Sequence, residues 1–351
     1  MFSTITGAHI AGIAAAVPKA VEEIADYPLF DAKAAKKFSK STGVYRRHIA
    51  DKNTTTADLC CAAGEKLIKD LGWEKSSIDL VILVTQTADY QVPATSPILQ
   101  NRLGLDTCAT VDINNGCSGW VYGLNTAASM LAQGEKRTRA LLFVGDTLSK
   151  VCSPTDKTTY PLFGDAATCT AIEWNEDSNE KMQFTLHTDG TGADMIKITA
   201  GGARNPLSAD SLLRKNRGEG ICRADNELYL GGMDVFGFGI TIAPECVQEL
   251  IKHFGIKTDE NTLYTFHQAN LMMNEMIRIK LDLTSDQVLE GLADYANTSG
   301  ATIPLTLIAK AKEKLTGGRV QHIGCGFGVG TSWGAVHLNT DKIIIPDIAE
   351  V

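Results

Sequence analysis

The sequence of 351 residues contains no long hydrophobic run, no Cys-x-x-Cys pair and no excess of positive charge. Its longest aliphatic stretches, such as Leu80–Val84, are far shorter than the ~20 apolar residues needed to cross a bilayer. The formal net charge of −8 disfavours nucleic acid or an anionic membrane as the main partner, because the field of the whole molecule repels both. Lys19 is the first cation, so we expect no secretory signal peptide.

The cysteines also lack the pattern of a disulfide framework or a metal site. There are nine of them, an odd number, scattered among apolar neighbours. This usage is typical of a reducing compartment, and we expect a cytoplasmic protein. None of the seven histidines stands at ligand spacing from two cysteines, so no metal site is expected.

Short apolar runs bounded by turn residues predict buried strands, and helical patterns lie between them. The strands are expected at residues 80–84, 109–112, 140–144, 263–266 and 320–323. The helices are expected at residues 56–71, 96–103, 118–133, 233–254, 271–281 and 303–315. This alternation predicts a layered α/β protein.

Two segments, 163–172 and 327–336, indicate an internal duplication. Both begin with Phe-Gly, continue with small residues and end on Ala followed by a β-branched residue, although a match this short can also arise by chance. We therefore expect two similar halves, at residues 1–175 and 231–351. The segment 176–230 is richer in Gly, Asn, Asp, Glu and Lys, which predicts an irregular excursion between the halves.

The segment from Val111 to Leu131 contains the first candidate for chemistry. A β-type run gives way to Asn-Asn-Gly and then to a helical pattern, so Cys117 falls at the first turn of a helix. The free N–H groups and positive dipole end at that position favour thiolate over thiol. Small neighbours would let a substrate approach the sulfur, but an inert buried cysteine fits the same pattern.

Two further segments carry polar residues where catalytic sites are common. His267 follows a predicted strand, and the carboxyl ends of strands are where open α/β sheets usually place their sites. Asn297 precedes a Ser/Thr-rich turn, and Pro304 suits the first turn of the next helix. Taken alone, a structural histidine and a capping asparagine explain these two positions equally well.

An ordered set of motifs through most of the chain is more specific than any one of them. In chain order the motifs are Ser41-Thr-Gly-Val-Tyr-Arg-Arg-His-Ile-Ala50, Cys117 in its helix, Ser153-Pro-Thr-Asp156, Phe163-Gly-Asp165, His267-Gln-Ala-Asn270, Asn297-Thr-Ser299 and Phe327-Gly-Val-Gly-Thr-Ser-Trp-Gly334. The set resembles the thiolase superfamily, and most closely the β-ketoacyl-acyl-carrier-protein synthase III family. Within that superfamily the classes differ in their three catalytic residues. These are Cys-His-Cys in thiolases, Cys-His-His in elongating synthases and Cys-His-Glu in hydroxymethylglutaryl-CoA synthases. The Cys-His-Asn set found here points to the initiating class or its acyltransferase offshoots.

The resemblance implies an α/β thiolase-like fold whose duplicated βαβ halves form five layers, α-β-α-β-α. The nucleophile Cys117 would belong to the first half, and His267 and Asn297 to the second. It also implies a homodimer and a condensing acyltransferase. Cys117 would take an acyl group from a thioester, with the backbone N–H groups of Cys117 and Val329 as the oxyanion hole. His267 and Asn297 would then stabilise the enolate left when a malonyl thioester loses carbon dioxide, without a metal or redox cofactor.

Departures from the family pattern affect the expected acyl donor. Lys37 stands where the family has a tryptophan that stacks on the adenine of coenzyme A, and Ser41, Lys157 and Met272 stand where it has cations. Lysine does not bind phosphate through two parallel hydrogen bonds as arginine does, so coenzyme A is expected to be a poor donor. An acyl carrier protein is the alternative donor, and the choice between the two stays open. Lys157 and Asn270 remain candidate substrate contacts by the resemblance.

Carrier proteins are acidic, so docking would need a local basic surface on this acidic chain. The candidates are Arg46, Arg47, Lys215 and Arg217, although an ordinary solvated face explains them equally well. Val92 stands where many relatives have a phenylalanine that reaches into the partner's acyl pocket. A smaller side chain there predicts a roomier pocket, unless another bulky residue compensates.

Two other functions stay open. The acyl-cysteine intermediate can also pass its acyl group to an oxygen or nitrogen nucleophile, as in acyltransferases of specialised metabolism. A non-catalytic binding protein on the same fold is disfavoured, because all three reactive side chains are present.

Overall fold

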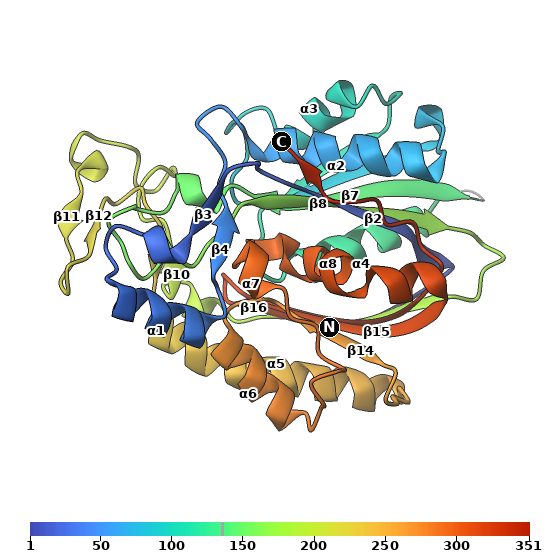
Figure 1. The fold of residues 1–351 in the computed structure, drawn as a ribbon. Helices are drawn as coiled ribbons and strands as arrows, with labels where there is room; N and C mark the ends of the chain where they lie inside the picture. Colours follow the sequence, from blue (N-terminus) through green and yellow to red (C-terminus); the bar gives the residue numbers. More distant parts are fainter. Residues whose placement is uncertain (135–136) are drawn as a thin grey trace.

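The computed structural model describes residues 1–134 and 137–351 and shows two sheets stacked between helices (Figure 1). One sheet contains, in spatial order, β17 (Ala349–Glu350), β2 (Ala8–Val17), β8 (Ala166–Trp174), β7 (Thr138–Asp146), β5 (Leu80–Val84) and β6 (Ala109–Ile113). The other contains β1 (Phe2–Thr6), β9 (Lys181–Thr188), β16 (Ser332–Asp341), β15 (Arg319–Gly328) and β14 (Leu263–Phe266).

Helices form three layers around these sheets (Figure 1). The outer face of the first sheet is covered by α2 (Thr56–Leu71) and α3 (Thr95–Arg102), and that of the second by α5 (Gly232–Phe254) and α6 (Leu271–Lys280). Between the sheets lie α4 (Gly119–Leu131) and α8 (Thr302–Gly317). The predicted five-layered thiolase-like arrangement is confirmed.

Burial explains the apolar runs on which the prediction depended. All five residues of β5 are buried, because helices cover both faces of its sheet. The middle-layer helix α4 contacts both sheets and is therefore apolar on most sides, with Trp120, Val121 and Leu124 fully buried. In the described residues, no helix is both long and apolar enough to span a membrane.

The two sheets repeat one topology, as the duplicated Phe-Gly segments predicted. In the first sheet β2 is antiparallel to β8, β8 is antiparallel to β7, and β7 is parallel to β5. In the second, β9, β16, β15 and β14 repeat these relations in the same order. The repeat leaves α4 and α8 in equivalent places between the sheets.

The predicted extent of the excursion is wrong at its start. Residues 181–188, within the predicted excursion 176–230, form β9, which pairs with both β1 and β16 inside the second sheet. The irregular part follows this strand and contains the short pairs β10 (Ile196–Lys197) with β13 (Tyr229–Leu230), and β11 (Lys215–Asn216) with β12 (Cys222–Arg223). The halves also exchange their ends, since β1 joins the second sheet and β17 the first.

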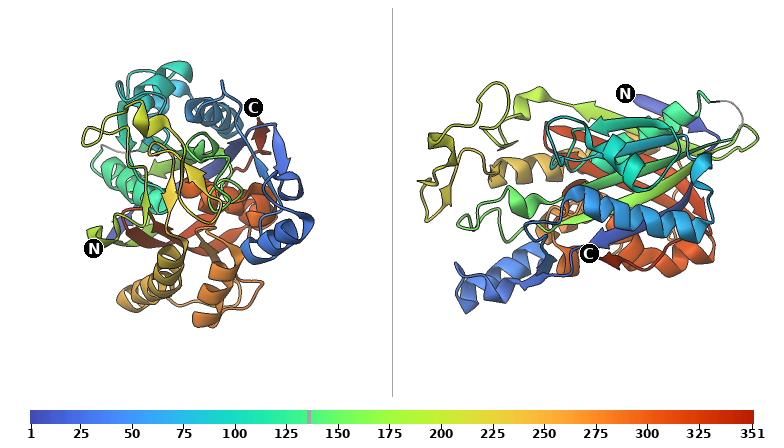
Figure 2. Two further views of the ribbon diagram at one scale, coloured as in Figure 1. Left: turned by 90° about the vertical axis from the view of Figure 1, so that its left-hand side faces the viewer. Right: turned by 90° about the horizontal axis from the view of Figure 1, so that it is seen from above.

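The helix α1 (Ala32–Thr42) was not predicted. The Asp31 carboxylate caps it by accepting a hydrogen bond from the Ala34 N–H at 2.7 Å, and Gly43 ends it in the left-handed conformation with φ 80°. Both views that show the length of the molecule place α1 at the same end as β11 and β12 (Figures 1 and 2). The remaining elements there are β3 (Val21–Glu23), β4 (Arg46–His48) and α7 (Leu292–Tyr295).

Candidate active site

Cys117, His267 and Asn297 line one cavity of about 180 Å³. Cys117 lies between β6 and α4, His267 directly follows β14, and Asn297 lies between α7 and α8. Three residues from distant parts of the chain are thus brought together at the ends of strands of both sheets. The apolar part of the cavity wall includes Leu148, Leu162, Phe163, Leu228, Val235 and Phe327.

Cys117 lies two residues before α4 begins, not in its first turn as the sequence pattern predicts, and its position does not make it a thiolate in the free protein. The side chain is buried, and this burial raises the pKa of its thiol to about 12. Hydrogen bonds from the backbone N–H groups of Val329 and of Cys117 itself lower the pKa, but by less. Because desolvation of the anion outweighs these donors, Cys117 needs a proton acceptor when it attacks.

Glycines of β15 allow the two halves to approach at the nucleophile. A Cβ atom on Gly328 would lie 2.6 Å from the Cβ and 2.7 Å from the Sγ of Cys117, which is closer than any side chain can come. A Cβ on Gly326 would lie 2.7 Å from the Cα of Ser118. The Phe-Gly-Val-Gly motif therefore permits the close contact that places the Val329 N–H beside the sulfur.

His267 is held by its backbone and by one ring nitrogen. Its N–H donates to the Cys325 carbonyl oxygen at 2.8 Å, and its Nδ1 lies 2.8 Å from the hydroxyl of Thr302. Burial lowers the pKa of the imidazole to about 3, so it is neutral at pH 7.

The Thr302 hydroxyl decides which ring nitrogen carries the proton. While it donates to the Ser299 carbonyl oxygen at 2.9 Å, it can only accept from Nδ1–H of His267, and Nε2 is free to take a proton. If it turns to donate to Nδ1, Nε2 carries the proton and becomes a donor. His267 can therefore serve as a base in one step and as a hydrogen-bond donor in another.

Asn297 is oriented by backbone contacts on both sides. Its Oδ1 accepts from the Ser299 N–H at 2.9 Å, which leaves the amide NH₂ group as the donor. Its own N–H donates to the Leu162 carbonyl oxygen and its carbonyl accepts from Gly164, both at 3.1 Å. The Phe163-Gly-Asp motif thus positions Asn297 at the cavity.

Arg47 is buried and holds the Phe163 backbone in place, so it does not form part of a basic surface. It is 1% exposed, donates to the Phe163 carbonyl oxygen at 2.9 Å and forms an ion pair with Glu22 at 2.6 Å. The other three candidates for a carrier surface are also neutralised: Arg46 by Asp294, Lys215 by Asp210 and Asp225, and Arg217 by Asp225. None of the four is a free cation for docking.

The structure places the remaining candidates at different distances from the chemistry. Asn270 lines the cavity, where its Oδ1 caps α6 by accepting from the Met273 N–H at 2.9 Å. Lys157 is half-buried beside Thr158, which lines the cavity, but does not line it itself. Val92 is 86% exposed and lies outside this cavity. The substrate contacts of Lys157 and Asn270 and the acyl-pocket role of Val92 stay predictions.

Sequence reasoning missed Thr302 and Gln86. Thr302 belongs to the Ser/Thr-rich turn that was noted only for helix capping, and its contact with His267 depends on the tertiary structure. Gln86 lines the cavity and follows β5 closely. Its place just after a buried strand was an available signal, because parallel strands present site residues at their carboxyl ends.

Comparisons with known proteins agree with this geometry. Residues 111–190 match the family described as 3-Oxoacyl-[acyl-carrier-protein (ACP)] synthase III, and residues 251–340 match its C-terminal part. The chain is 32% identical to the β-ketoacyl-[acyl-carrier-protein] synthase III of Clostridium acetobutylicum over 87% of this chain and 90% of that protein. It is 30% identical to the enzyme of the same name from Rhodopirellula baltica, over 94% and 97%.

Among solved structures, a 3-oxoacyl-(acyl-carrier protein) synthase from Burkholderia xenovorans superposes with a TM-score of 0.92. It is 36% identical and the match covers 100% of this chain and 99% of that one. Sequence and fold therefore agree over essentially the whole length of both chains. The chain belongs to the β-ketoacyl-[acyl-carrier-protein] synthase III family of the thiolase superfamily.

Proposed function

We propose that this acyl-transferring condensing enzyme of fatty-acid or related biosynthesis works through Cys117, His267 and Asn297. An acyl group would pass from an acyl thioester to Cys117, and a malonyl thioester on acyl carrier protein would then condense with it. The observation that carries the proposal is the single buried cavity lined by all three side chains, with two backbone N–H groups directed at the sulfur.

In the first half-reaction, the Cys117 thiol gives its proton to Nε2 of His267 while the sulfur attacks the carbonyl carbon of the acyl thioester. The backbone N–H groups of Cys117 and Val329 hold the oxyanion that forms. The carrier thiolate leaves and takes the proton back from His267. One difficult exchange is thereby divided into two easier steps.

In the second half-reaction, the carboxylate of the malonyl thioester leaves as carbon dioxide and its electron pair forms an enolate. The amide of Asn297 and Nε2–H of His267 donate hydrogen bonds to the enolate oxygen, which requires the Thr302 hydroxyl to donate to Nδ1. The enolate carbon attacks the acyl carbonyl, and Cys117 leaves as a thiolate that takes up one proton from solvent and becomes a thiol again. The reaction is a carbon–carbon bond formation coupled to loss of carbon dioxide, so we propose the two thioesters and one proton as its reactants, with no added cofactor.

An assay of intact protein mass together with carbon dioxide release tests this function. The protein is incubated with a panel of acyl-carrier and acyl-coenzyme A donors and then with carboxyl-labelled malonyl-carrier. We expect an acyl adduct on Cys117, followed by labelled carbon dioxide in a one-to-one ratio with β-ketoacyl product. An adduct that yields ester or amide without carbon dioxide would support acyl transfer to oxygen or nitrogen instead. No adduct with any donor would contradict both.

We also propose that the enzyme is a homodimer and that it works in the reducing cytoplasm. The nine cysteines are all free, which favours a reducing compartment, and cell fractionation would check this. At the edge of the first sheet, β6 is exposed or half-buried along its length, and no described residue forms a strand on its outer side. Tyr90 and Val92, in the nearby loop, are 62% and 86% exposed.

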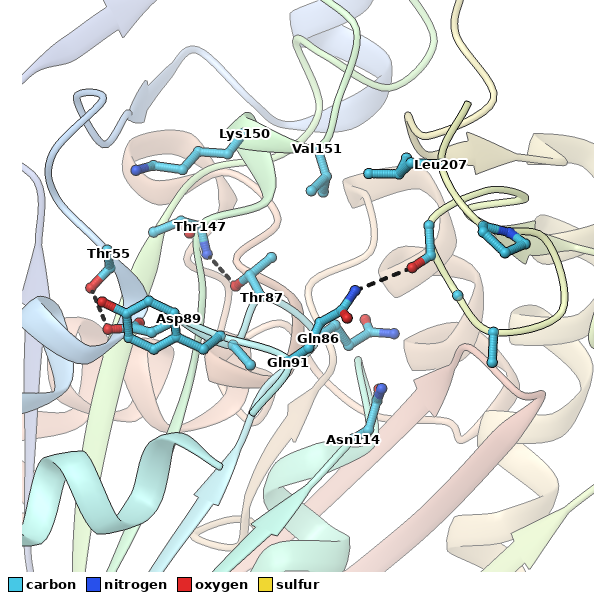
Figure 3. Close-up of a pocket in the computed structure, with 16 residues that line it drawn as sticks. Thr55, Gln86, Thr87, Asp89, Gln91, Asn114, Thr147, Lys150, Val151 and Leu207 are labelled. Atoms are coloured by element: carbon cyan, nitrogen blue, oxygen red, sulfur yellow. Dashed lines mark hydrogen bonds between the residues drawn. The ribbon is translucent and has the colours of Figure 1, made fainter. Parts of the chain in front are cut away.

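A second, open cavity supports an interface on this face. It measures about 1110 Å³ and is lined by the loop after β5 and by part of the excursion, where Gln91 donates to the Gly201 carbonyl oxygen at 3.3 Å (Figure 3). Gln86 lines this cavity as well as the one at Cys117. A second chain on this face would therefore bring its loop close to the site of acylation.

Sedimentation equilibrium is expected to give the mass of two chains. If the loop of one chain reaches the acyl cavity of the other, Val92→Phe should shorten the longest acyl chain accepted, because the larger side chain fills the space. The matched substitution Val21→Phe, at an exposed position of β3, should leave the chain-length profile unchanged. A monomer at micromolar concentration, or equal profiles for both variants, would contradict the proposed interface.

A further inference from the structure

Four lysines form a basic face on α1, the helix that sequence reasoning missed. Lys33, Lys36, Lys37 and Lys40 are exposed and follow the spacing of three and four residues that places side chains on one side of a helix. The opposite side of α1 packs on the protein through the buried Ala35 and Ser39 and the half-buried Phe38. We call these four side chains the α1 lysine face.

The α1 lysine face is not neutralised by the protein. Among the ion pairs and side-chain hydrogen bonds of residues 1–134 and 137–351, none involves any of its four ammonium groups. The cations of the neighbouring helix α6 differ, since Arg278 pairs with Glu275 at 2.8 Å and Lys280 donates to the Ile240 carbonyl oxygen at 2.8 Å. On a chain of net charge −8, α1 therefore presents a concentrated, free positive charge.

This face adjoins the outer wall of the Cys117 cavity. Phe38, on the buried side of α1, packs in the same apolar cluster as Leu162 and Phe163, which line the cavity. At the end of α1, a Cβ on Gly43 would lie 2.9 Å from the Cβ of Leu271, the first residue of α6, next to the cavity residue Asn270. The helix that carries the lysines thus packs against residues that line the substrate cavity or lie next to it.

The shape of the face favours a protein over a nucleotide. Small phosphate ligands bind in concave sites, whereas no residue of α1 lines any of the five cavities outlined in the described chain. The four lysines extend along roughly 10 Å of helix at a rise of ~1.5 Å per residue. An exposed row of this length matches an acidic helix or loop on the surface of a second protein.

We propose that the α1 lysine face is the surface on which an acidic acyl carrier protein docks. The inference rests on the proposed function, which requires a carrier-bound malonyl thioester. It replaces Arg46, Arg47, Lys215 and Arg217, which the structure shows to be paired. The helix α6 packs beside α1, and its second residue, Met272, is exposed.

The test compares two double variants of equal charge change. Lys36→Glu with Lys40→Glu reverses charge on α1, and Lys69→Glu with Lys181→Glu does so on α2 and β9, elements that contribute no residue to the Cys117 cavity. Carrier affinity is measured by fluorescence anisotropy of labelled malonyl-carrier, and kcat/KM is measured with carrier-bound, coenzyme A and N-acetylcysteamine thioesters. Anisotropy does not depend on turnover, so failure of docking and failure of the proposed reaction are distinguishable.

We expect the α1 variant to lose about tenfold or more in carrier affinity and in kcat/KM for carrier-bound substrate, with the difference shrinking at high salt. Its kcat/KM for the N-acetylcysteamine thioester should stay unchanged, as should all values of the α2/β9 variant. Lys36→Gln with Lys40→Gln, which removes charge without reversing it, should give an intermediate loss. Unchanged carrier affinity, an equal loss in the α2/β9 variant, or an equal loss with the small thioester would overturn the proposal. A loss confined to acyl-coenzyme A would overturn it in favour of nucleotide binding.

Discussion

Replacing Cys117 by alanine is expected to abolish S-acylation and condensation while leaving decarboxylation of the malonyl thioester measurable. The substitution removes the sulfur that is proposed to hold the acyl group, so condensation should fall by at least about 10³-fold. In the proposed mechanism, decarboxylation depends instead on His267 and Asn297, whose contacts with Thr302 and Ser299 do not involve the sulfur. Intact mass after incubation with an acyl donor and release of labelled carbon dioxide measure the two activities separately.

Cys222→Ala provides the matched control for this prediction. Cys222 is a half-buried free cysteine of β12 and does not line the cavity, so its loss should leave both half-reactions intact. Thermal unfolding of both variants should stay close to that of the parent protein, because each substitution removes one sulfur atom. Condensation at the parental rate in Cys117→Ala would remove this residue from the mechanism.

Replacing Asn297 by alanine should affect the second half-reaction far more than the first. The substitution removes one of two donors to the enolate oxygen, and loss of a comparable oxyanion donor typically costs about 10²- to 10³-fold in rate. S-acylation uses the backbone N–H groups of Cys117 and Val329 and should fall by less than about tenfold. The rates of single-turnover acylation and of malonyl decarboxylation are measured on the same preparation. The ratio of the two losses shows which half-reaction depends on Asn297.

Two further variants test whether the effect of Asn297→Ala comes from the loss of its amide donor. Asn297→Asp keeps the acceptor oxygen for the Ser299 N–H but removes the amide donor, so it should be as defective in decarboxylation as the alanine variant. Asn339→Ala, in β16 and outside the cavity, should have parental activity. Equal losses of acylation and decarboxylation in Asn297→Ala would show that this residue supports the fold of the cavity rather than the enolate.

Local signals explain why most elements were predicted closely. The helix α2 begins and ends as expected because Thr55 and Asp58 form a capping box and Gly72 ends the helix in a left-handed conformation. The strand β5 matches its predicted bounds because its apolar run is bounded by polar residues. In both cases the information lies within a few residues of the element itself.

The elements that were missed have weaker hydrophobic patterns than α2 and β5. The helix α1 has an N-cap at Asp31 and a left-handed Gly43 at its end, but four lysines dilute its apolar positions, and only Ala35 and Ser39 within it are buried. The strand β9 alternates polar and apolar residues, which is the pattern of a half-buried strand, but this pattern lies in a charged neighbourhood and was not used. Its place inside the second sheet depends on distant partners, since it pairs with β1 and with β16, which lies some 150 residues further along the chain.

The sequence by itself determined the layered α/β class and the duplication, because strand patterns, caps and ordered motifs are written in neighbouring residues. The same motifs predict Cys117, His267 and Asn297 as the reactive residues, and the structure places all three at one cavity. Only the tertiary structure decided the ionisation of Cys117, since burial among residues of the other half outweighs the local effect of the helix start. It also decided which cations are free. Arg46 is neutralised by Asp294, which is distant along the chain, whereas the lysines of α1 meet no carboxylate in the described residues. The pKa of a group and the pairing of its charge depend on which other groups folding brings within a few ångströms. The spacing of residues along the sequence does not give these distances.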